Sequence, residues 1–269
     1  MPSFKPWSRK RLRSAQVRLP IGMSYGPECP LDVEQPVMLH RWERLSFLHW
    51  SFEPHVVQRL LPSRLTVETY EDRAWVGLVP FFMRVSTKTG RNARWASNFC
   101  ETNVRTYVRD HEGRSGIWFF SLDAERLGAV VTARATYRLP YFWSKMHLIE
   151  GRGEIDYACE RIWPRPRARS VVRLKIGLAF ARDELTERDH FLTARWVLFS
   201  SAGTRRRFAD AQHTPWPLKH ATPIRCEDRL LVAAGLPISD EAPICHYSDG
   251  VDVRIGRPQR YVASSRESR

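Results

Sequence analysis

The chain has 269 residues, of which 43% are hydrophobic and 12% aromatic, so it is long and apolar enough for one domain with a bulky core. No apolar run approaches the ~20 residues that a membrane helix requires, and no apolar stretch of a secretory signal follows the basic N-terminus. We therefore expect a cytoplasmic protein. The five cysteines are widely spaced without a CxxC pair, which argues against a disulfide framework and a zinc knuckle.

The net charge of +14 lies mainly at the two ends of the chain. Residues 1–20 carry +6 and residues 254–269 carry +4, so the two ends hold +10 of the total. We predict a disordered basic arm at 1–35, a folded domain at 36–258 and a basic tail at 259–269. Basic tails bind phosphate weakly and without sequence preference, so we expect nucleic acid to contact the chain only in this way.

The folded body is predicted to begin with a strand at 44–50, which is rich in aromatic and aliphatic residues. A short helix is expected after Pro54, which suits a first helical turn, and Pro62 ends it. The β-branched and aromatic runs 65–70 and 74–86 predict a hairpin.

Two more strands are expected at 98–109 and 116–122, and after them the period changes. The sequence predicts a helix that Asp123 caps and Pro140 ends. Its apolar face is expected to consist of Leu127, Val130, Val131 and Arg134.

The rest of the body alternates strands and turns, with two short helices at 187–192, capped by Thr186, and near 228–235. A turn at 151–153 joins the first two of these strands. The predicted strands are 142–150, 154–163, 171–180, 194–201, 217–227 and 245–256. Because βαβ alternation is missing, we predict one α+β domain, mostly β, whose antiparallel or mixed sheet closes on itself.

Charged residues on the predicted core faces are the first candidates for a site. Arg134 lies on the apolar face of its helix, where a lone guanidinium costs several kcal/mol, so it needs a partner. Glu101 is the candidate partner, and Arg105 shares its strand face. A carboxylate between two arginines suits a small anionic or carbonyl compound. The alternative is a structural ion-pair network.

The histidines and the common enzyme motifs give no metal or cofactor site. His49 ends a strand and is interpreted as a core histidine with a hydrogen bond. His213, in a predicted aromatic turn, and His220 lack a helical metal-ligand spacing. There is no GxSxG elbow, glycine-rich phosphate loop or HExxH motif. We therefore expect no metal and no cofactor.

Several longer motifs resemble the YqjF-like proteins, a bacterial family of uncharacterised function. They occur in order between Val37 and Arg254, and they are Phe47-Leu48-His49-Trp50, Ala74-Trp75-Val76-Gly77-Leu78-Val79-Pro80-Phe81, Glu101-Thr102-Asn103-Val104-Arg105-Thr106-Tyr107-Val108, Gly116-Ile117-Trp118-Phe119-Phe120-Ser121-Leu122-Asp123, Leu139-Pro140-Tyr141, His213-x-x-Trp216-Pro217-Leu218 and His246-Tyr247-Ser248-x-Gly250-Val251-Asp252-Val253. That family is distantly similar to acetoacetate decarboxylase. The resemblance implies the same fold, a β-cone or barrel-like sheet around an interior pocket.

The resemblance also locates a departure from decarboxylase chemistry. In the decarboxylase segment Arg-Glu-x-x-Gly-x-Pro-Lys-Lys, the first Lys forms a Schiff base with the substrate. Here Arg134 and Pro140 fit that frame, Tyr141 stands in place of the nucleophilic Lys, and Phe142 follows it. A phenol with a pKa of ~10 cannot form an imine, which requires a primary amine. Lys145 is the only nearby amine in the sequence, and we expect it to be a solvated strand lysine.

These residues predict a small-molecule pocket in a decarboxylase-like fold that lacks the Schiff-base lysine. Tyr141 and Glu101 are the candidate catalytic groups, and the substrate-binding candidates are Arg105, Arg134, His49 and Trp118. Such a pocket suits an enzyme or a binding module. The alternatives are a nucleic-acid-associated protein that acts through its basic tails and a structural or interaction protein. The expected partners are a small organic ligand and a second copy of the chain, without a membrane.

Overall fold

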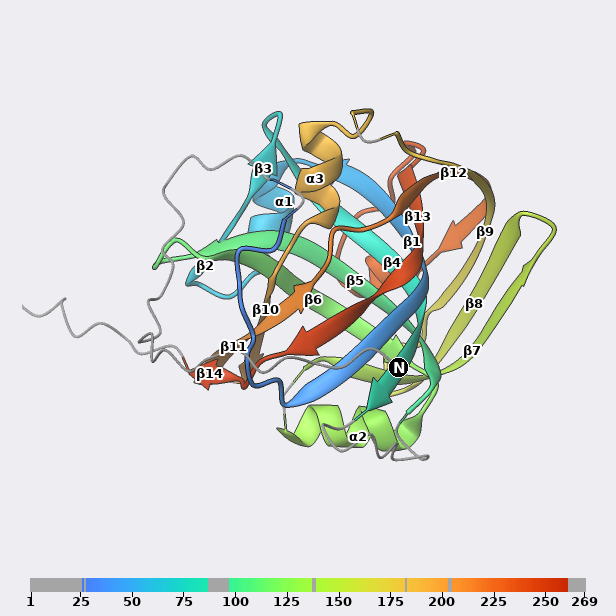
Figure 1. Cartoon of the computed structure of the whole chain (residues 1–269). Coiled ribbons are helices and arrows are strands. Elements are labelled where there is room, and N and C mark those ends of the chain that lie inside the picture. Colours follow the sequence, from blue (N-terminus) through green and yellow to red (C-terminus); the bar gives the residue numbers. More distant parts are fainter. Residues whose placement is uncertain are drawn as a thin grey trace, which may run out of the picture.

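The fold was obtained as a computed structural model, which describes residues 26, 28–86, 97–136, 139–181, 183–202 and 205–260. Strands dominate these residues and form one mixed sheet (Figure 1). The strands are β1 (Met38–Phe52), β2 (Leu65–Val67), β3 (Thr69–Tyr70), β4 (Arg73–Ser86), β5 (Phe99–Asp110), β6 (Ser115–Ala124), β7 (Tyr141–Gly151), β8 (Glu154–Trp163), β9 (Arg169–Ala179), β10 (Val197–Ala202), β11 (Arg205–His213), β12 (Leu218–Asp228), β13 (Ile244–Ile255) and β14 (Gln259–Arg260).

The sheet closes on itself twice within the described residues. One ring of paired strands runs β1–β4–β5–β6–β10–β11–β13 and back to β1. A second ring leaves β6 through β7, β8, β9 and β12 and returns to β13. The β6–β10 and β6–β7 pairs are parallel, and the other pairs in both rings are antiparallel. The prediction of a mixed sheet that closes on itself is therefore confirmed.

The strands shared by the rings bury both of their faces. On β1, Phe47 packs in the core of the first ring and its neighbour Leu48 in the core of the second ring. On β4, Val79 packs in the core of the first ring and its neighbour Leu78 in the core of the second ring. Since successive side chains of a strand point to opposite faces, β1 and β4 need apolar residues at consecutive positions. This explains the continuous apolar run in β4 and the adjacent apolar pair Phe47-Leu48 in β1.

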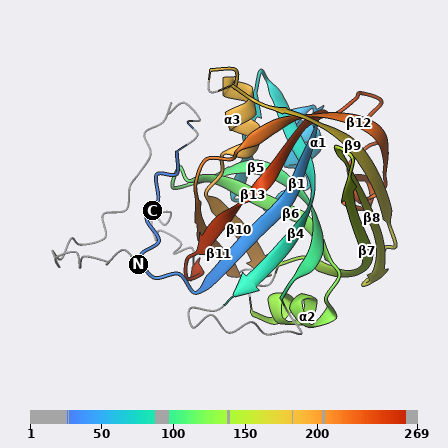
Figure 2. The same ribbon diagram turned by 45° about the vertical axis from the view of Figure 1, so that its right-hand side comes forward.

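In the part of the chain that the structure describes, four short helices border the sheet: α1 (Pro54–Gln58), α2 (Leu127–Thr136), α3 (Glu187–Thr193) and α4 (Leu230–Ala233). Figures 1 and 2 show α2 at one end of the molecule and α3 at the opposite end. Thr186 caps α3 in a capping box with Asp189, so that predicted cap is confirmed. None of these described helices is long and apolar enough to span a membrane.

The structure corrects the predicted start and orientation of α2. Asp123 is not a helix cap: it belongs to β6 and is fully buried, with hydrogen bonds to Arg161 of β8. The helix begins at Leu127 and buries Val130, while Leu127 and Val131 are 43% and 53% exposed. A distant cation has therefore outweighed the local capping preference of the aspartate.

Three further differences concern strand pairing and the chain ends. Only β3 of the predicted run 65–70 forms the expected hairpin with β4, whereas β2 pairs with β5. β11 was not predicted, and His213 ends that strand instead of lying in a turn. Val33 is buried and its N–H donates to Gln212 Oε1, so the last residues of the predicted arm contact the sheet. Residues 1–25 of the arm, residues 87–96 of the loop before β5, and residues 261–269 of the tail lie outside the described residues.

Candidate functional site

The first ring of strands encloses a cavity of about 210 Å³. Its walls are mostly apolar, with side chains such as Phe81, Phe119 and Leu122 on β4 and β6. Ala129 and Ala133 of α2 line it as well. Because the shared strands need apolar residues on both faces, the same pattern that forms the core also lines this cavity.

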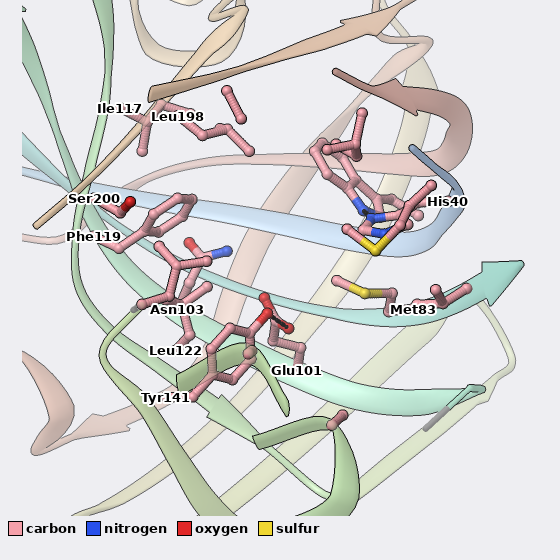
Figure 3. Close-up of a pocket in the computed structure, with 18 of the residues that line it drawn as sticks. His40, Met83, Glu101, Asn103, Ile117, Phe119, Leu122, Tyr141, Leu198 and Ser200 are labelled. Atoms are coloured by element: carbon pink, nitrogen blue, oxygen red, sulfur yellow. Dashed lines mark hydrogen bonds between the residues drawn. The ribbon is translucent and has the colours of Figure 1, made fainter. Parts of the chain in front are cut away.

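A short row of polar side chains on β5 faces the cavity. Glu101, Asn103 and Arg105 are two residues apart, so they share one strand face, and all three are buried. Tyr141, the first residue of β7, lies opposite, and its hydroxyl donates to Glu101 Oε2 at 2.8 Å. Figure 3 shows Tyr141 and Glu101 pointing toward each other, with Asn103 beside them.

Burial changes the acid–base properties of this pair. It raises the pKa of Glu101 from the usual 4.5 to about 8, although the hydrogen bonds from Tyr141 and Asn103 partly offset the increase. Burial and the neighbouring Glu101 carboxyl raise the pKa of Tyr141 well above 10. At neutral pH, Glu101 is therefore mainly a neutral acid that can donate a hydrogen bond.

Arg105 lies at a different point of the same wall. Its Nη2 donates to the Leu192 carbonyl at 3.4 Å, close to the C-terminus of α3. Its Cζ is 5.3 Å from the ring centre of Phe47 and 5.9 Å from that of Tyr107. Among the described residues, no carboxylate lies within 4.0 Å of this guanidinium. The arginine is held by a carbonyl and by aromatic faces, which leaves its charge without a buried counter-ion.

Arg134 does not take the predicted place beside Glu101. It is exposed, its Nη1 donates to the Tyr141 carbonyl at 2.6 Å, and its Cζ lies 5.6 Å from the Trp163 ring centre. The prediction that Arg134 faces the core and pairs with Glu101 is wrong, because α2 buries a different face. Arg134 instead contacts the backbone of Tyr141, a residue of the cavity wall.

The other two substrate-binding candidates lie outside the cavity wall. His49 is buried, and its Nε2 is 2.6 Å from the Tyr107 hydroxyl. Burial and the nearby Arg105 hold the pKa of His49 well below 6.5. Trp118 lies in an outer groove together with Arg134, and this groove shares Phe119, Leu139 and Ser200 with the cavity.

The described lining includes no lysine, and Lys145 is exposed on β7. The described part of the chain also has no group of three or more His, Cys, Asp or Glu residues that could hold a metal ion. The polar groups of the described wall include a carboxyl, a phenol, an amide and a guanidinium group.

Sequence reasoning missed several polar residues of the described lining, among them Asn103 and His40. Asn103 stands between Glu101 and Arg105 on the same strand face, so strand alternation alone would have identified it. His40 Nδ1 accepts a hydrogen bond from Trp42 Nε1 at 3.3 Å, and burial lowers the pKa of His40 to about 4. No sequence signal marks His40, which lies among the mixed polar and apolar residues at the start of β1.

The sequence matches a protein family and a curated relative of similar length. The DUF2071 family, described as an uncharacterized conserved protein, matches residues 40–252. The uncharacterized protein YqjF of Bacillus subtilis (strain 168) is 31% identical over 223 residues, which are 81% of this chain and 89% of YqjF.

Solved structures with the same fold have much lower sequence identity. An acetoacetate decarboxylase-like enzyme from Sphingomonas wittichii RW1 superposes with a TM-score of 0.59 at 11% identity and covers 85% of this chain and 94% of its own. Acetoacetate decarboxylase from Legionella pneumophila gives 0.60 at 12% identity, with 87% and 92% covered. The enduracididine biosynthesis enzyme MppR, complexed with pyruvate, gives 0.58 at 11% identity, with 84% and 91% covered. The family matches and the superpositions thus agree with the predicted resemblance, and the chain belongs to the DUF2071 family with an acetoacetate decarboxylase-like fold.

Proposed function

We propose that this protein binds a small carbonyl or anionic compound in the cavity of the first strand ring, where Tyr141 and Glu101 contact the polar group of the ligand. The observation that supports this most is the Tyr141–Glu101 hydrogen bond in the wall of an otherwise apolar cavity of about 210 Å³. A buried carboxyl without a cationic partner costs folding free energy, which a ligand-binding role would account for.

The chemistry of the proposal follows from the neutral state of Glu101. A protonated carboxyl donates a hydrogen bond to a carbonyl or enol oxygen, and the Tyr141 hydroxyl orients that carboxyl. If the ligand is turned over, Glu101 is placed to act as a general acid or base near neutral pH. The complex of MppR with pyruvate supports this choice of ligand class, because it shows a small carbonyl acid bound to a protein of similar fold.

Arg105 and Arg134 would contact different parts of a ligand. Arg105 borders the cavity and would hold an anionic group of the ligand. Arg134 and Trp118 border the outer groove that shares three residues with the cavity, so they would contact a ligand outside the cavity. His49 would act indirectly, because it contacts Tyr107, whose ring lies beside Arg105.

Imine chemistry is not part of the proposal. Tyr141 occupies the position that resembles the Schiff-base lysine, and the described lining residues include no lysine. An imine requires a primary amine. Borohydride treatment in the presence of pyruvate should therefore leave the mass of the protein unchanged, and a trapped pyruvate adduct on a lysine would contradict this part of the proposal.

The binding experiment uses ketones, keto acids and carboxylates of up to about ten non-hydrogen atoms, since an apolar cavity of about 150 Å³ holds benzene. A compound that binds the native state should raise the melting temperature in proportion to the logarithm of its concentration. We expect Tyr141→Phe and Glu101→Gln each to weaken the best binder about tenfold, which corresponds to one lost hydrogen bond.

The matched controls are Tyr70→Phe and Glu160→Gln, which change the same residue types outside the cavity. They should leave the affinity unchanged. Unchanged affinity in both Tyr141→Phe and Glu101→Gln, with the proteins folded, would overturn the assignment of the site.

A further inference from the structure

One polar atom in the cavity wall has no hydrogen-bond partner among the described residues. Asn103 is 5% exposed, and its Oδ1 is buried without a hydrogen bond among the described residues. Its amide N–H donates to the Glu101 carboxyl, which turns the carbonyl end of the side chain away from that contact. An unpaired buried carbonyl costs free energy, and a hydrogen-bond donor of a ligand at this atom would remove that cost.

Glu101 supplies the complementary group next to it. Its carboxyl accepts hydrogen bonds from the Tyr141 hydroxyl and the Asn103 amide. In the neutral form, the carboxyl's own O–H remains free to donate into the cavity. The wall therefore presents one donor and one acceptor side by side, because Glu101 and Asn103 are two residues apart on one face of β5.

The charge around this pair favours a neutral ligand. No cation lies within 4.0 Å of Glu101 in the described part of the chain, and the guanidinium of Arg105 contacts the Leu192 carbonyl and two aromatic rings instead. A carboxylate at Glu101 and Asn103 would lose its hydration next to another carboxyl group, without a counter-ion.

We propose that the cavity recognises a neutral compound in which a hydrogen-bond acceptor and an N–H or O–H donor are adjacent, with a primary carboxamide as the simplest case. The acceptor of the ligand faces the O–H of Glu101, and its donor faces Oδ1 of Asn103. An apolar body of about eight to ten non-hydrogen atoms would fill the rest of the cavity. This inference rests on the proposed function and commits it to one ligand class.

Three probes of equal size and shape separate the classes: 2-phenylacetamide, phenylacetone and phenylacetate. They differ only in the group on the carbonyl carbon, which is an amino group, a methyl group or an anionic oxygen. At pH 7 we expect the amide to bind about tenfold more tightly than the ketone, because only the amide satisfies Asn103 Oδ1. The affinity of the amide should be constant from pH 5 to 7, whereas that of phenylacetate should fall about tenfold per pH unit as the acid ionises.

Asn103→Leu is the variant that tests the acceptor, and Ser200→Ala is its control at another polar residue of the lining. Asn103→Leu should abolish the tenfold preference for the amide over the ketone, while Ser200→Ala should keep it. The comparison of probes on the unaltered protein decides the inference even if Asn103→Leu does not fold.

Two outcomes overturn the inference and leave the proposed function standing: equal affinity for amide and ketone, or tightest binding of phenylacetate at pH 7. If all three probes and the whole panel of carbonyl compounds and carboxylates fail to bind, the proposed function is overturned as well. Isothermal titration calorimetry distinguishes these results.

Discussion

Two opposing effects set the protonation state of the Glu101 carboxyl. The cavity excludes water from its carboxyl, which favours the neutral form, whereas the Tyr141 hydroxyl and the Asn103 amide donate hydrogen bonds that favour the anion. Burial has the larger effect, and the pKa of about 8 leaves the acid able to change protonation state close to neutral pH. Such a carboxyl can donate a hydrogen bond to an oxygen atom of a ligand when it is neutral, and accept one when it is ionised.

The raised pKa of Glu101 predicts a pH dependence of stability. Its contribution to stability is fully present below the unfolded pKa of 4.5 and is lost as the pH rises toward the folded pKa of about 8. Between these values, the free energy of unfolding should fall by up to about 1.4 kcal/mol per pH unit relative to Glu101→Gln, which cannot ionise. Urea unfolding of both proteins from pH 4 to 9 measures this difference, and parallel curves would contradict it.

At the residue scale, the sequence identified a good part of the cavity wall but not its arrangement. Strand alternation correctly placed Glu101 and Arg105 on one face of β5, and the resemblance drew attention to Tyr141. Arg134 was misplaced, because helical periodicity shows which residues share a face but not which face packs against the sheet. Asn103 was passed over although the same strand alternation places it between Glu101 and Arg105.

At the scale of elements, a buried ion pair joins β6, β7 and β8 beside the cavity. Arg161 Nε and Nη2 donate to the Asp123 carboxylate at 2.8 and 2.7 Å, and Ser144 Oγ donates to the same group at 2.8 Å. The Arg161 guanidinium also lies 3.6 Å from the ring centre of Phe142. Both charges are removed from water, so each depends on the other.

Arg161→Met should therefore destabilise the protein by about 3–5 kcal/mol, because it leaves the Asp123 carboxylate buried and unpaired. Adding Asp123→Asn to this variant should recover part of the loss. The control is Arg173→Met on β9, which removes an exposed ion pair with Asp156 of β8 and should change little. Chemical denaturation measures all of these changes, and equal effects of Arg161→Met and Arg173→Met would contradict the role given to the buried pair.

Most strands and the capped helix α3 could be predicted, because their signals are local. Turn residues mark the β7–β8 hairpin, and Thr186 marks the start of α3. β11 was missed because it pairs with β10, β13 and β14, which are brought together only when the sheet closes. Asp123 was misread as a cap for a similar reason, since its partner Arg161 lies 38 residues away.

At the scale of the whole molecule, the two rings share β1, β4, β5, β6 and β13. Phe119 belongs to the core of the first ring and Ile155 to that of the second ring. Because neither ring is closed without the shared strands, we expect both cores to unfold together. A chain of this length could otherwise unfold in steps.

Calorimetry should accordingly show one unfolding transition with equal calorimetric and van't Hoff enthalpies. Phe119→Ala and Ile155→Ala should each lower the temperature of that single transition, since each leaves a cavity that costs several kcal/mol, on the order of 3. Two resolved transitions, each moved by only one of these variants, would show that the rings are independent units.

The central claim is that Glu101 is a neutral acid facing a ligand cavity, and ¹³C NMR of the glutamate carboxyl carbons tests it most directly. Glu101→Gln identifies the resonance by its disappearance. We predict a titration with a pKa of about 8 that moves higher when the best-binding carbonyl compound saturates the protein, because the ligand accepts a hydrogen bond from the neutral carboxyl. A titration close to 4.5, or a pKa that saturating ligand leaves unchanged, would contradict the claim.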